Sequence, residues 1–336
     1  LAAPRGAPLH TFHPPRRVAS GPSARGSAAG RPRRVSVMAS PTTGVDALPG
    51  KLPNWTWQQS MLRIKDPAAS LAFYRDTLGL TLIDKLDFEQ WGFSLYFLMS
   101  LPKDQPYTLT PGSQEAHEFL WTTNGTTIEL THNYGSEAKE GAVYHPGNQE
   151  RDGFGHLAFA VDDVYAACAE LEAAGVKFKK KPDEGRMKGL AFAYDPDGYW
   201  MEIISRGPAP NAPKFALAQT MLRVKDPKAS VDFYTKHLGM TLVRESHFDS
   251  FSLYFLATLP DGVEVPDPSS EAGREFTKNV LYSGAVPVLE LTHNHGTEND
   301  ADFAYHNGNT EPHKGFGHIG FMVDDVNEAC AALEAA

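Results

Sequence analysis

Apolar and polar positions follow one another along the chain in an order that predicts short strands and amphipathic helices. The first apolar run, at 61–64, is short and favours a strand. Asp66 can cap a helix with a proline in its first turn, and Gly79 can end that helix. The apolar residues between them recur at helical spacing. Three further runs predict strands at 80–88, 93–99 and 127–131.

The same order of elements returns further along. The pattern predicts a strand at 155–161 and a helix at 163–174 that Gly175 ends. Strands at 176–179, 190–194 and 200–204 follow. Strand, helix and three strands, twice over, indicate an α+β fold.

The chain also repeats itself. The motif QSMLRIKDP at Gln59 returns as QTMLRVKDP at Gln219, and GFGHLAFAVDDV at Gly153 returns as GFGHIGFMVDDV at Gly315. The spacing is 160 residues at the first motif and 162 at the last. We therefore expect two tandem domains, at 51–206 and 214–336, joined by a linker rich in proline and alanine at 207–213.

The second copy is expected to be incomplete at its C-terminal end. The first copy continues beyond its second helix through residues 177–205. The second ends at Ala336, inside the equivalent helix.

Composition narrows the class of protein. Hydrophobic residues make up 41% and charged residues 21%, as in ordinary globular domains. A formal net charge of -10 disfavours a nucleic-acid partner. The absence of any long apolar run disfavours a transmembrane helix. The cysteines, Cys168 and Cys330, both fall in alanine-rich helical segments, so a disulfide is not expected.

The N-terminal residues 1–50 differ from the rest and are expected to be a disordered, transit-peptide-like segment. The first 45 residues contain seven arginines and no acidic residue. This predicts an organellar protein, with the chloroplast favoured over the mitochondrion. A start at Met38 would instead give a cytoplasmic form, and a plain disordered tail is the alternative interpretation.

Polar residues interrupt several of the predicted strands. Any one of them could simply point to solvent, because alternate strand positions face opposite sides. Their recurrence in both copies favours a binding role, since carboxylates and imidazoles on an inward face are costly unless they bind something. These residues outline a candidate metal cup: Gln59, Glu129, His156 and Glu202 in the first copy, and Gln219, Glu290 and His318 in the second.

The motifs QTMLRVKDP, FSLYFL, LELTHN, GFGH and DPDGYWMEI resemble those of the glyoxalase I (lactoylglutathione lyase) family, over about residues 55–336. The resemblance implies the vicinal-oxygen-chelate fold of paired βαβββ modules. It implies isomerisation of the methylglyoxal–glutathione hemithioacetal to S-lactoylglutathione, with glutathione as co-substrate. Family members hold an octahedral metal through Gln, Glu, His and Glu. A Gln first ligand and the insertion at 101–125 resemble the zinc-type subgroup, although Ni²⁺ or Co²⁺ could replace Zn²⁺.

In homodimeric members each site is shared between subunits, so a tandem fusion implies a monomer with an internal pseudo-dimer. The complete site would combine Gln219 and Glu290 with His156 and Glu202. The incomplete site would combine Gln59, Glu129 and His318, without a second Glu.

The resemblance also implies roles for individual residues. Glu202 would move the substrate proton, and Glu290 would serve the opposite enantiomer. Asp152 departs from the family, which usually has Arg at that position, and an acid there would repel a glutathione carboxylate unless Arg151 replaced the missing charge. The family's glutathione contacts match Arg223, Asn294, Lys180 and Arg186 at the complete site, and Arg63, Asn133 and Lys314 in the corresponding positions.

Two other functions remain alternatives at this point. A different enzyme of the superfamily, such as an iron dioxygenase, would require two His and one carboxylate with open positions. A non-catalytic binding protein could keep the fold and lose the ligands.

Overall fold

The computed structural model describes residues 55–336, and the segment for which we expect a transit peptide lies outside the described residues. The described part of the first half (55–206) contains these elements: β1 Thr56–Ile64, α1 Pro67–Leu71, η1 Ala72–Thr77, β2 Thr81–Phe88, η2 Glu89–Trp91, β3 Phe93–Met99, α2 Gln114–Leu120, β4 Thr127–Asn133, β5 Phe154–Val161, α3 Val164–Ala173, β6 Phe178–Lys180, β7 Ala191–Tyr194 and β8 Trp200–Ser205.

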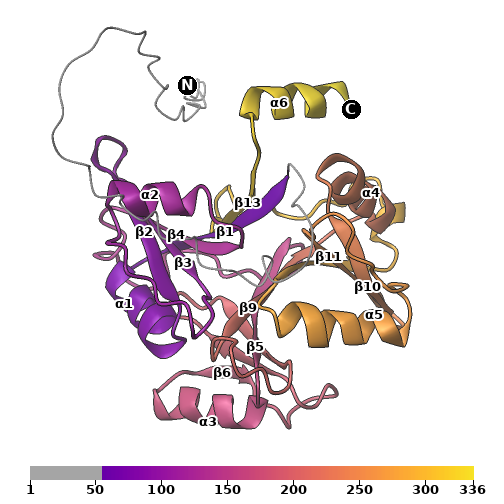
Figure 1. Cartoon of the computed structure of the whole chain (residues 1–336), viewed down its shortest axis with the longest axis horizontal. Coiled ribbons are helices and arrows are strands. Elements are labelled where there is room, and N and C mark those ends of the chain that lie inside the picture. The colour runs from indigo at the N-terminus through magenta and orange to yellow at the C-terminus, as the bar shows by residue number, and fades with distance from the viewer. Residues whose placement is uncertain (1–54) are drawn as a thin grey trace, which may run out of the picture. The chain divides into compact units, whose positions relative to one another are not determined.

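The second half (214–336) repeats this order as far as its second helix (Figure 1). Its elements are β9 Ala216–Arg223, α4 Pro227–Asp232, η3 Phe233–His237, β10 Thr241–His247, β11 Phe251–Ala257, α5 Glu271–Phe276, η4 Thr277–Tyr282, β12 Val288–Asn294, η5 Thr297–Asn299, β13 Phe316–Met322 and α6 Val326–Ala335. The predicted α+β class is confirmed, and no described helix has the length and apolar character needed to cross a membrane.

The first predicted helix begins where expected and then changes its winding. Asp66 accepts a hydrogen bond from the backbone N–H of Ala68, as an N-cap residue should. After Leu71 the helix continues as the π-helical segment η1, and Gly79 follows in a left-handed conformation with a φ of 78°. The second half makes the same change from α4 to η3. Apolar spacing indicates helix, but it does not reveal the wider π turn.

The strands form two sheets, and each sheet contains strands from both halves. The five-stranded sheet has the order β13-β1-β4-β3-β2, and the eight-stranded sheet has the order β10-β11-β12-β9-β5-β8-β7-β6. The halves join through antiparallel pairs, β1 with β13 and β5 with β9. The expected linker at 207–213 contains no helix or strand. The domain boundaries themselves stay a prediction, because the sheets cross them.

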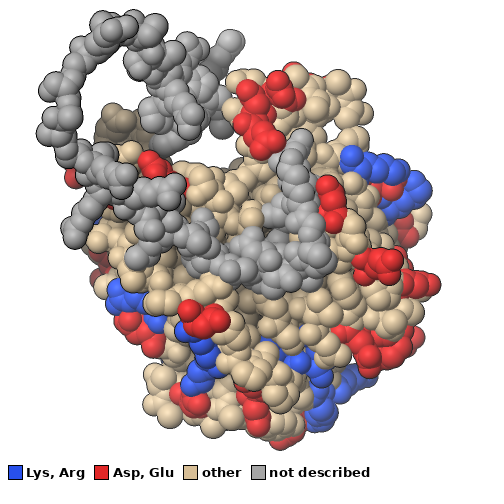
Figure 2. All heavy atoms as spheres, in the orientation of Figure 1, with Lys and Arg blue, Asp and Glu red and all other residues tan. Residues whose placement is uncertain are grey.

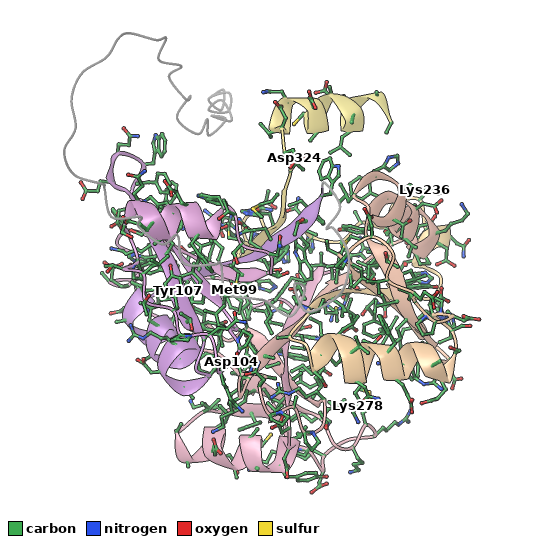
Figure 3. All side chains as sticks on the ribbon, viewed as in Figure 1. Met99, Asp104, Tyr107, Lys236, Lys278 and Asp324 are labelled. Carbon is green, nitrogen blue, oxygen red and sulfur yellow. The ribbon has the colours of Figure 1, made fainter. Side chains whose placement is uncertain are left out.

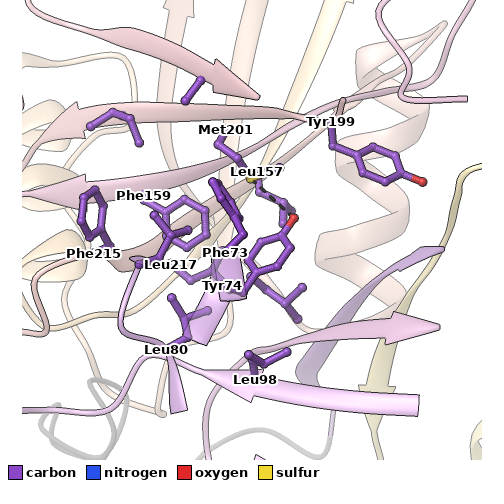
Figure 4. Packing of buried hydrophobic residues seen from close by; sticks show 14 of the residues in the cluster. Phe73, Tyr74, Leu80, Leu98, Leu157, Phe159, Tyr199, Met201, Phe215 and Leu217 are labelled. Carbon is purple, nitrogen blue, oxygen red and sulfur yellow. Dashed lines mark hydrogen bonds between the residues drawn. The ribbon is translucent and has the colours of Figure 1, made fainter. Parts of the chain in front are cut away.

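The largest core cluster fills the first half between its two sheets. Leu98 of β3, Leu157 and Phe159 of β5 and Met201 of β8 are almost fully buried in it (Figure 4). Burying each such side chain contributes about 1.5–3 kcal/mol. Tyr74 is also buried there, and its hydroxyl donates to Asp195 at 2.8 Å, which satisfies a polar group that would otherwise be costly.

The insertion between β3 and β4 packs on the outer strands of the first sheet. Its helix α2 buries Phe119 and Leu120 against Met99 and its neighbours. Tyr107 joins this cluster, on the same side of the molecule as Met99 in Figure 3, and its hydroxyl donates to the carbonyl of Ile83 at 2.7 Å. The insertion is therefore a packed part of the fold.

Candidate active site

Four neighbouring strands of the eight-stranded sheet each carry one polar side chain to the same face. In the order β12, β9, β5 and β8, they supply Glu290, Gln219, His156 and Glu202. Met221 is the register partner of both Glu290 and His156, and it lies two positions from Gln219. Because alternate residues share a face, the side chains converge. The structure thus brings together the four residues that the resemblance assigns to the complete site.

These four side chains are buried and in mutual contact. Each is at most 8% exposed. The Nε2 atom of His156 lies 3.3 Å from Glu202 Oε2 and 3.6 Å from Glu290 Oε2. Gln219 Nε2 donates to Glu202 Oε2 at 3.3 Å and also to Glu290. Two carboxylates, an imidazole and an amide converging in a buried space form the kind of donor set that a divalent cation binds.

The geometry around His156 supports this interpretation. Burial lowers the pKa of His156, but Glu202 and Glu290 raise it more, to about 9. Its Nε2 atom is nevertheless buried without a hydrogen-bond partner, although both carboxylates are near. Ligands of one metal, at about 2.1 Å from it, lie about 3 Å apart. The spacing around His156 therefore fits shared coordination better than hydrogen bonding, and the donor set fits zinc.

Tyr282 adds a contact that the sequence did not reveal. It is buried at the end of η4, and its hydroxyl donates to Gln219 Oε1 at 2.5 Å. Burial raises the pKa of Tyr282, so the hydroxyl stays protonated. Thr292 likewise donates to Glu290 Oε1 at 3.4 Å. Such second contacts fix the orientation of metal-binding side chains. In the sequence, the one sign of this contact is that a tyrosine stands shortly before the LELTHN motif.

The five-stranded sheet brings together the partial set in the same way. β13, β1 and β4 are neighbours and supply His318, Gln59 and Glu129. His318 Nε2 lies 3.0 Å from Gln59 Nε2 and 3.4 Å from Glu129 Oε2. The His318 side chain is 46% exposed, against 7% for that of His156. Among residues 55–336, no second carboxylate joins His318 and Glu129 in a metal-binding group.

Aromatic side chains flank both ligand sets. Phe255 pairs with Glu290 across β11 and β12, and Phe97 pairs with Glu129 across β3 and β4. Both rings are almost fully buried. Phe251 and Phe93 pair with Asn294 and Asn133 and are half-buried.

Two of the arginines expected to contact glutathione, Arg63 and Arg223, bind the opposite half of the chain. Arg63 Nη1 donates to the carbonyls of Gly308, Gly315 and Phe316 at 3.2–3.3 Å. Arg223 Nη1 donates to the carbonyls of Asp152 and Phe154 at 3.1 Å. Each guanidinium therefore ties the two halves together close to one ligand set, whatever else it binds.

The other residues expected to contact the substrate make fewer hydrogen bonds to the protein than the two arginines do. Asn294 and Asn133 donate to the tyrosine hydroxyls of Tyr305 and Tyr144. Desolvation, followed by the nearby Lys188, lowers the pKa of Lys180, whose ammonium donates to the Leu190 carbonyl at 2.6 Å. Arg186 is exposed and Lys314 is half-buried.

The Asp152 carboxylate is buried and hydrogen-bonded within the protein. It is 3% exposed, and its Oδ2 atom lies 2.6 Å from His145 Nε2 and accepts from the Gln149 N–H. Although burial raises the pKa of Asp152, His145 and these hydrogen bonds lower it overall. Arg151 lies over the ring of Phe303. The carboxylate that could repel glutathione is thus directed into a cluster of histidines.

Comparisons with known proteins agree with this geometry. The family model described as the Glyoxalase/Bleomycin resistance protein/Dioxygenase superfamily matches residues 57–203 and 216–336. "Glyoxalase I" of Saccharomyces cerevisiae is 42% identical over 290 residues, covering 84% of this chain and 82% of that protein. "Probable lactoylglutathione lyase, chloroplastic" of Arabidopsis thaliana is 30% identical over 277 residues, covering 81% of this chain and 61% of that protein. The crystal structure of glyoxalase I from Zea mays aligns with a TM-score of 0.57 at 26% identity, covering 84% of this chain and 79% of that one.

A double match to the superfamily model, on a fold of two repeated α+β units, defines the class of protein. The chain belongs to the glyoxalase/bleomycin resistance protein/dioxygenase superfamily and, within it, to the glyoxalase I (lactoylglutathione lyase) enzymes.

Proposed function

We propose that the chain converts the hemithioacetal of methylglyoxal and glutathione to S-D-lactoylglutathione at one complete metal site. Gln219, Glu290, His156 and Glu202 would hold a divalent cation, with Zn²⁺ favoured by the mixed nitrogen and oxygen donors and Ni²⁺ or Co²⁺ as substitutes. The observation that carries this proposal is the buried convergence of these four side chains, with His156 Nε2 lacking a hydrogen bond.

The reaction moves a proton between two adjacent carbons of the substrate. A bound divalent cation supplies Lewis-acid stabilisation of the negative charge that develops on the neighbouring oxygens. Glu202 accepts the proton from the first carbon and returns it to the second, as a general base and then a general acid. Glu290, on the opposite side of His156, does the same for the other enantiomer.

Burial helps both carboxylates in this role. Glu202 is 8% exposed and Glu290 is 5% exposed, so few water molecules compete for the proton in transit. Glutathione would bind through Arg223, Asn294, Lys180 and Arg186, whose charges and amide suit its two carboxylates. Among residues 55–336 no fourth ligand joins the set Gln59, Glu129 and His318, which has Arg63, Asn133 and Lys314 nearby, so we expect these residues to bind metal and substrate weakly there.

The decisive experiment is a metal-dependent activity assay. Chelated protein receives Zn²⁺, Ni²⁺ or Co²⁺, and thioester absorbance reports S-lactoylglutathione formed from methylglyoxal and glutathione. We expect metal to restore activity and Glu202→Gln to reduce kcat by at least about 100-fold, the usual contribution of a general base.

The matched control is Glu129→Gln, which changes the equivalent glutamate of the partial set and should leave most activity intact. Activity that survives Glu202→Gln but is lost in Glu129→Gln would contradict the assignment of the working site. No activity with any metal, in folded protein, would favour a binding protein.

Other observations support proposals about the oligomeric state of the protein, its binding partners and its location in the cell. Sheets shared between the halves support a monomer with an internal pseudo-dimer. On the face drawn in Figure 2, basic side chains of the described residues lie in small groups among acidic and neutral ones, which does not suit a nucleic acid or an anionic membrane. The arginine-rich start and the chloroplastic Arabidopsis relative support delivery to a chloroplast.

A further inference from the structure

A second cluster of metal-binding side chains lies where the two halves meet, apart from the four residues of the complete site. It comprises His145 and Asp152 from the loop before β5, and His313 from the equivalent loop before β13. His145 Nε2 lies 2.6 Å from Asp152 Oδ2, and His313 Nδ1 lies 3.3 Å from Asp152 Oδ1. The ligand atoms of all three residues fall within 4.8 Å of one another.

One hydrogen bond joins His145 to Asp152 Oδ2, but two other polar atoms of the cluster have no hydrogen-bond partner among the described residues. Asp152 is 3% exposed, and its Oδ1 atom is buried without a hydrogen-bond partner among the described residues. The same holds for His313 Nδ1, although the two atoms lie near each other. Buried polar atoms normally find a partner, so an orphaned pair aimed at the same space indicates a ligand. The residues line a pocket that Phe154 and Phe316 also border.

We propose that His145 Nε2, His313 Nδ1 and the Asp152 carboxylate bind a second zinc ion that joins the two halves. Imidazole nitrogen and carboxylate oxygen are zinc ligands, at about 2.0–2.2 Å from the metal. Neighbouring ligands of a tetrahedral zinc then lie about 3.3 Å apart, which the His313–Asp152 distance matches. The 2.6 Å between His145 Nε2 and Asp152 Oδ2 is a hydrogen-bond distance, so this pair would have to separate when the ion binds. We expect water to supply the fourth ligand.

The repeat explains why this site is single. His145 in HPGN corresponds to His306 in HNGN, but the position of Asp152 is occupied by Lys314 in the second copy. His306 does not add a ligand atom to the cluster, and its ring stacks on His313 at a centroid distance of 3.6 Å. Stacking holds the His313 ring in place, while the peptide of His306 pairs with the chain beside Asp152. The ion would therefore add a link between two loops that backbone hydrogen bonds already join.

Zinc content tests the proposal. The full chain is chelated, reloaded with Zn²⁺, freed of excess metal and analysed for zinc per chain by atomic emission. We expect His313→Gln to bind one zinc fewer than the unchanged chain. The same loss should appear when both carry His156→Gln and Glu290→Gln, which remove the metal of the active site.

His117→Gln is the matched control. His117 pairs with the buried carboxylate of Asp84 just as His145 pairs with Asp152, but no third metal-binding side chain in the described part of the chain joins that pair. We expect this variant to keep its full zinc content. Equal zinc in the unchanged chain and in folded His313→Gln would overturn the proposal and leave a plain cluster of two histidines and an aspartate.

Cobalt gives a reading that does not depend on the folding of any variant. Co²⁺ in a four-coordinate site absorbs visible light far more strongly than Co²⁺ in the six-coordinate active site expected of this family. Titration of the unchanged chain should therefore show a strong band from one equivalent of cobalt. Weak absorption alone, at saturating Co²⁺, would also overturn the proposal.

Discussion

At the scale of single residues, Tyr282 distinguishes the complete ligand set from the partial one. Its hydroxyl contacts Gln219, whereas the equivalent position in the first half is Trp121, which is 43% exposed and has no hydroxyl. The amide oxygen has two lone pairs, so Gln219 Oε1 can accept from Tyr282 and also bind a cation. Tyr282 therefore positions Gln219 without touching the cation.

We expect Tyr282→Phe to weaken zinc binding by about tenfold, because losing such a supporting contact typically costs 10–100-fold in metal affinity. Competition with a chelator of known affinity measures the change, and the melting temperature of the metal-free chain checks that the fold is intact. Trp121→Phe is the control and should bind zinc like the unchanged chain. Equal affinity in both variants would show that Gln219 needs no support from Tyr282.

The candidate metal ligands could be predicted from the sequence, but the residues that hydrogen-bond to these ligands could not. Glu129 and Glu290 interrupt apolar strands in both copies, so their repetition marks them as unusual. The contact of Tyr282 with Gln219 joins residues 63 positions apart. No local spacing predicts such a contact, and the approach of His313 to Asp152 was unpredictable for the same reason, because the two residues belong to different halves of the chain.

At the scale of elements, the two copies of the second helix provide a natural comparison. Asp163 caps α3 by accepting from the N–H groups of Tyr165 and Ala166, and Asp325 caps α6 in the same way. α3 buries four residues in the core, whereas α6 buries none. In Figure 1, α6 stands apart from the sheets at the end of an extended segment. Identical caps thus stand on helices with very different tertiary contacts.

Asp163→Ala should lower the free energy of global unfolding by about 1 kcal/mol, the typical contribution of an N-cap side chain. Asp325→Ala should leave it nearly unchanged, because α6 can fray without exposing core. Denaturant titration followed by fluorescence measures both. If the two substitutions destabilise the chain equally, α6 must contribute to the cooperative fold more than its exposure indicates.

The positions of the helices and strands could be predicted well from the sequence, but the order of the strands in the sheets could not. The predicted strands at 93–99 and 200–204 match β3 and β8 closely, because apolar runs bounded by turn residues define strands locally. Pairing of β5 with β9 depends on how distant segments meet. That arrangement could be anticipated only from the family resemblance, through its crossed sites.

At the scale of the whole molecule, two arginines connect the halves through related contacts. Arg63 donates to carbonyls around Gly315, and Arg223 donates to carbonyls around Gly153. Both lie at the junctions where strands of different halves pair. The resemblance assigns both to glutathione, and the structure shows that they also hold the pseudo-dimer together. Loss of the first role would weaken substrate binding, and loss of the second would lower stability, so a matched pair of substitutions can separate them.

Arg63→Lys and Arg223→Lys keep the positive charge but lose the forked donor geometry. Each should lower the free energy of unfolding by on the order of 2 kcal/mol, as expected for hydrogen bonds from a charged group. Only Arg223→Lys should also raise KM for the hemithioacetal, because within residues 55–336 four ligands converge beside Arg223 and three beside Arg63. Denaturant titration and steady-state kinetics measure the two effects. An Arg63→Lys variant of unchanged stability would mean that the paired strands alone hold the halves, whereas an unchanged KM in Arg223→Lys would assign Arg223 to the junction and leave glutathione to Asn294, Lys180 and Arg186.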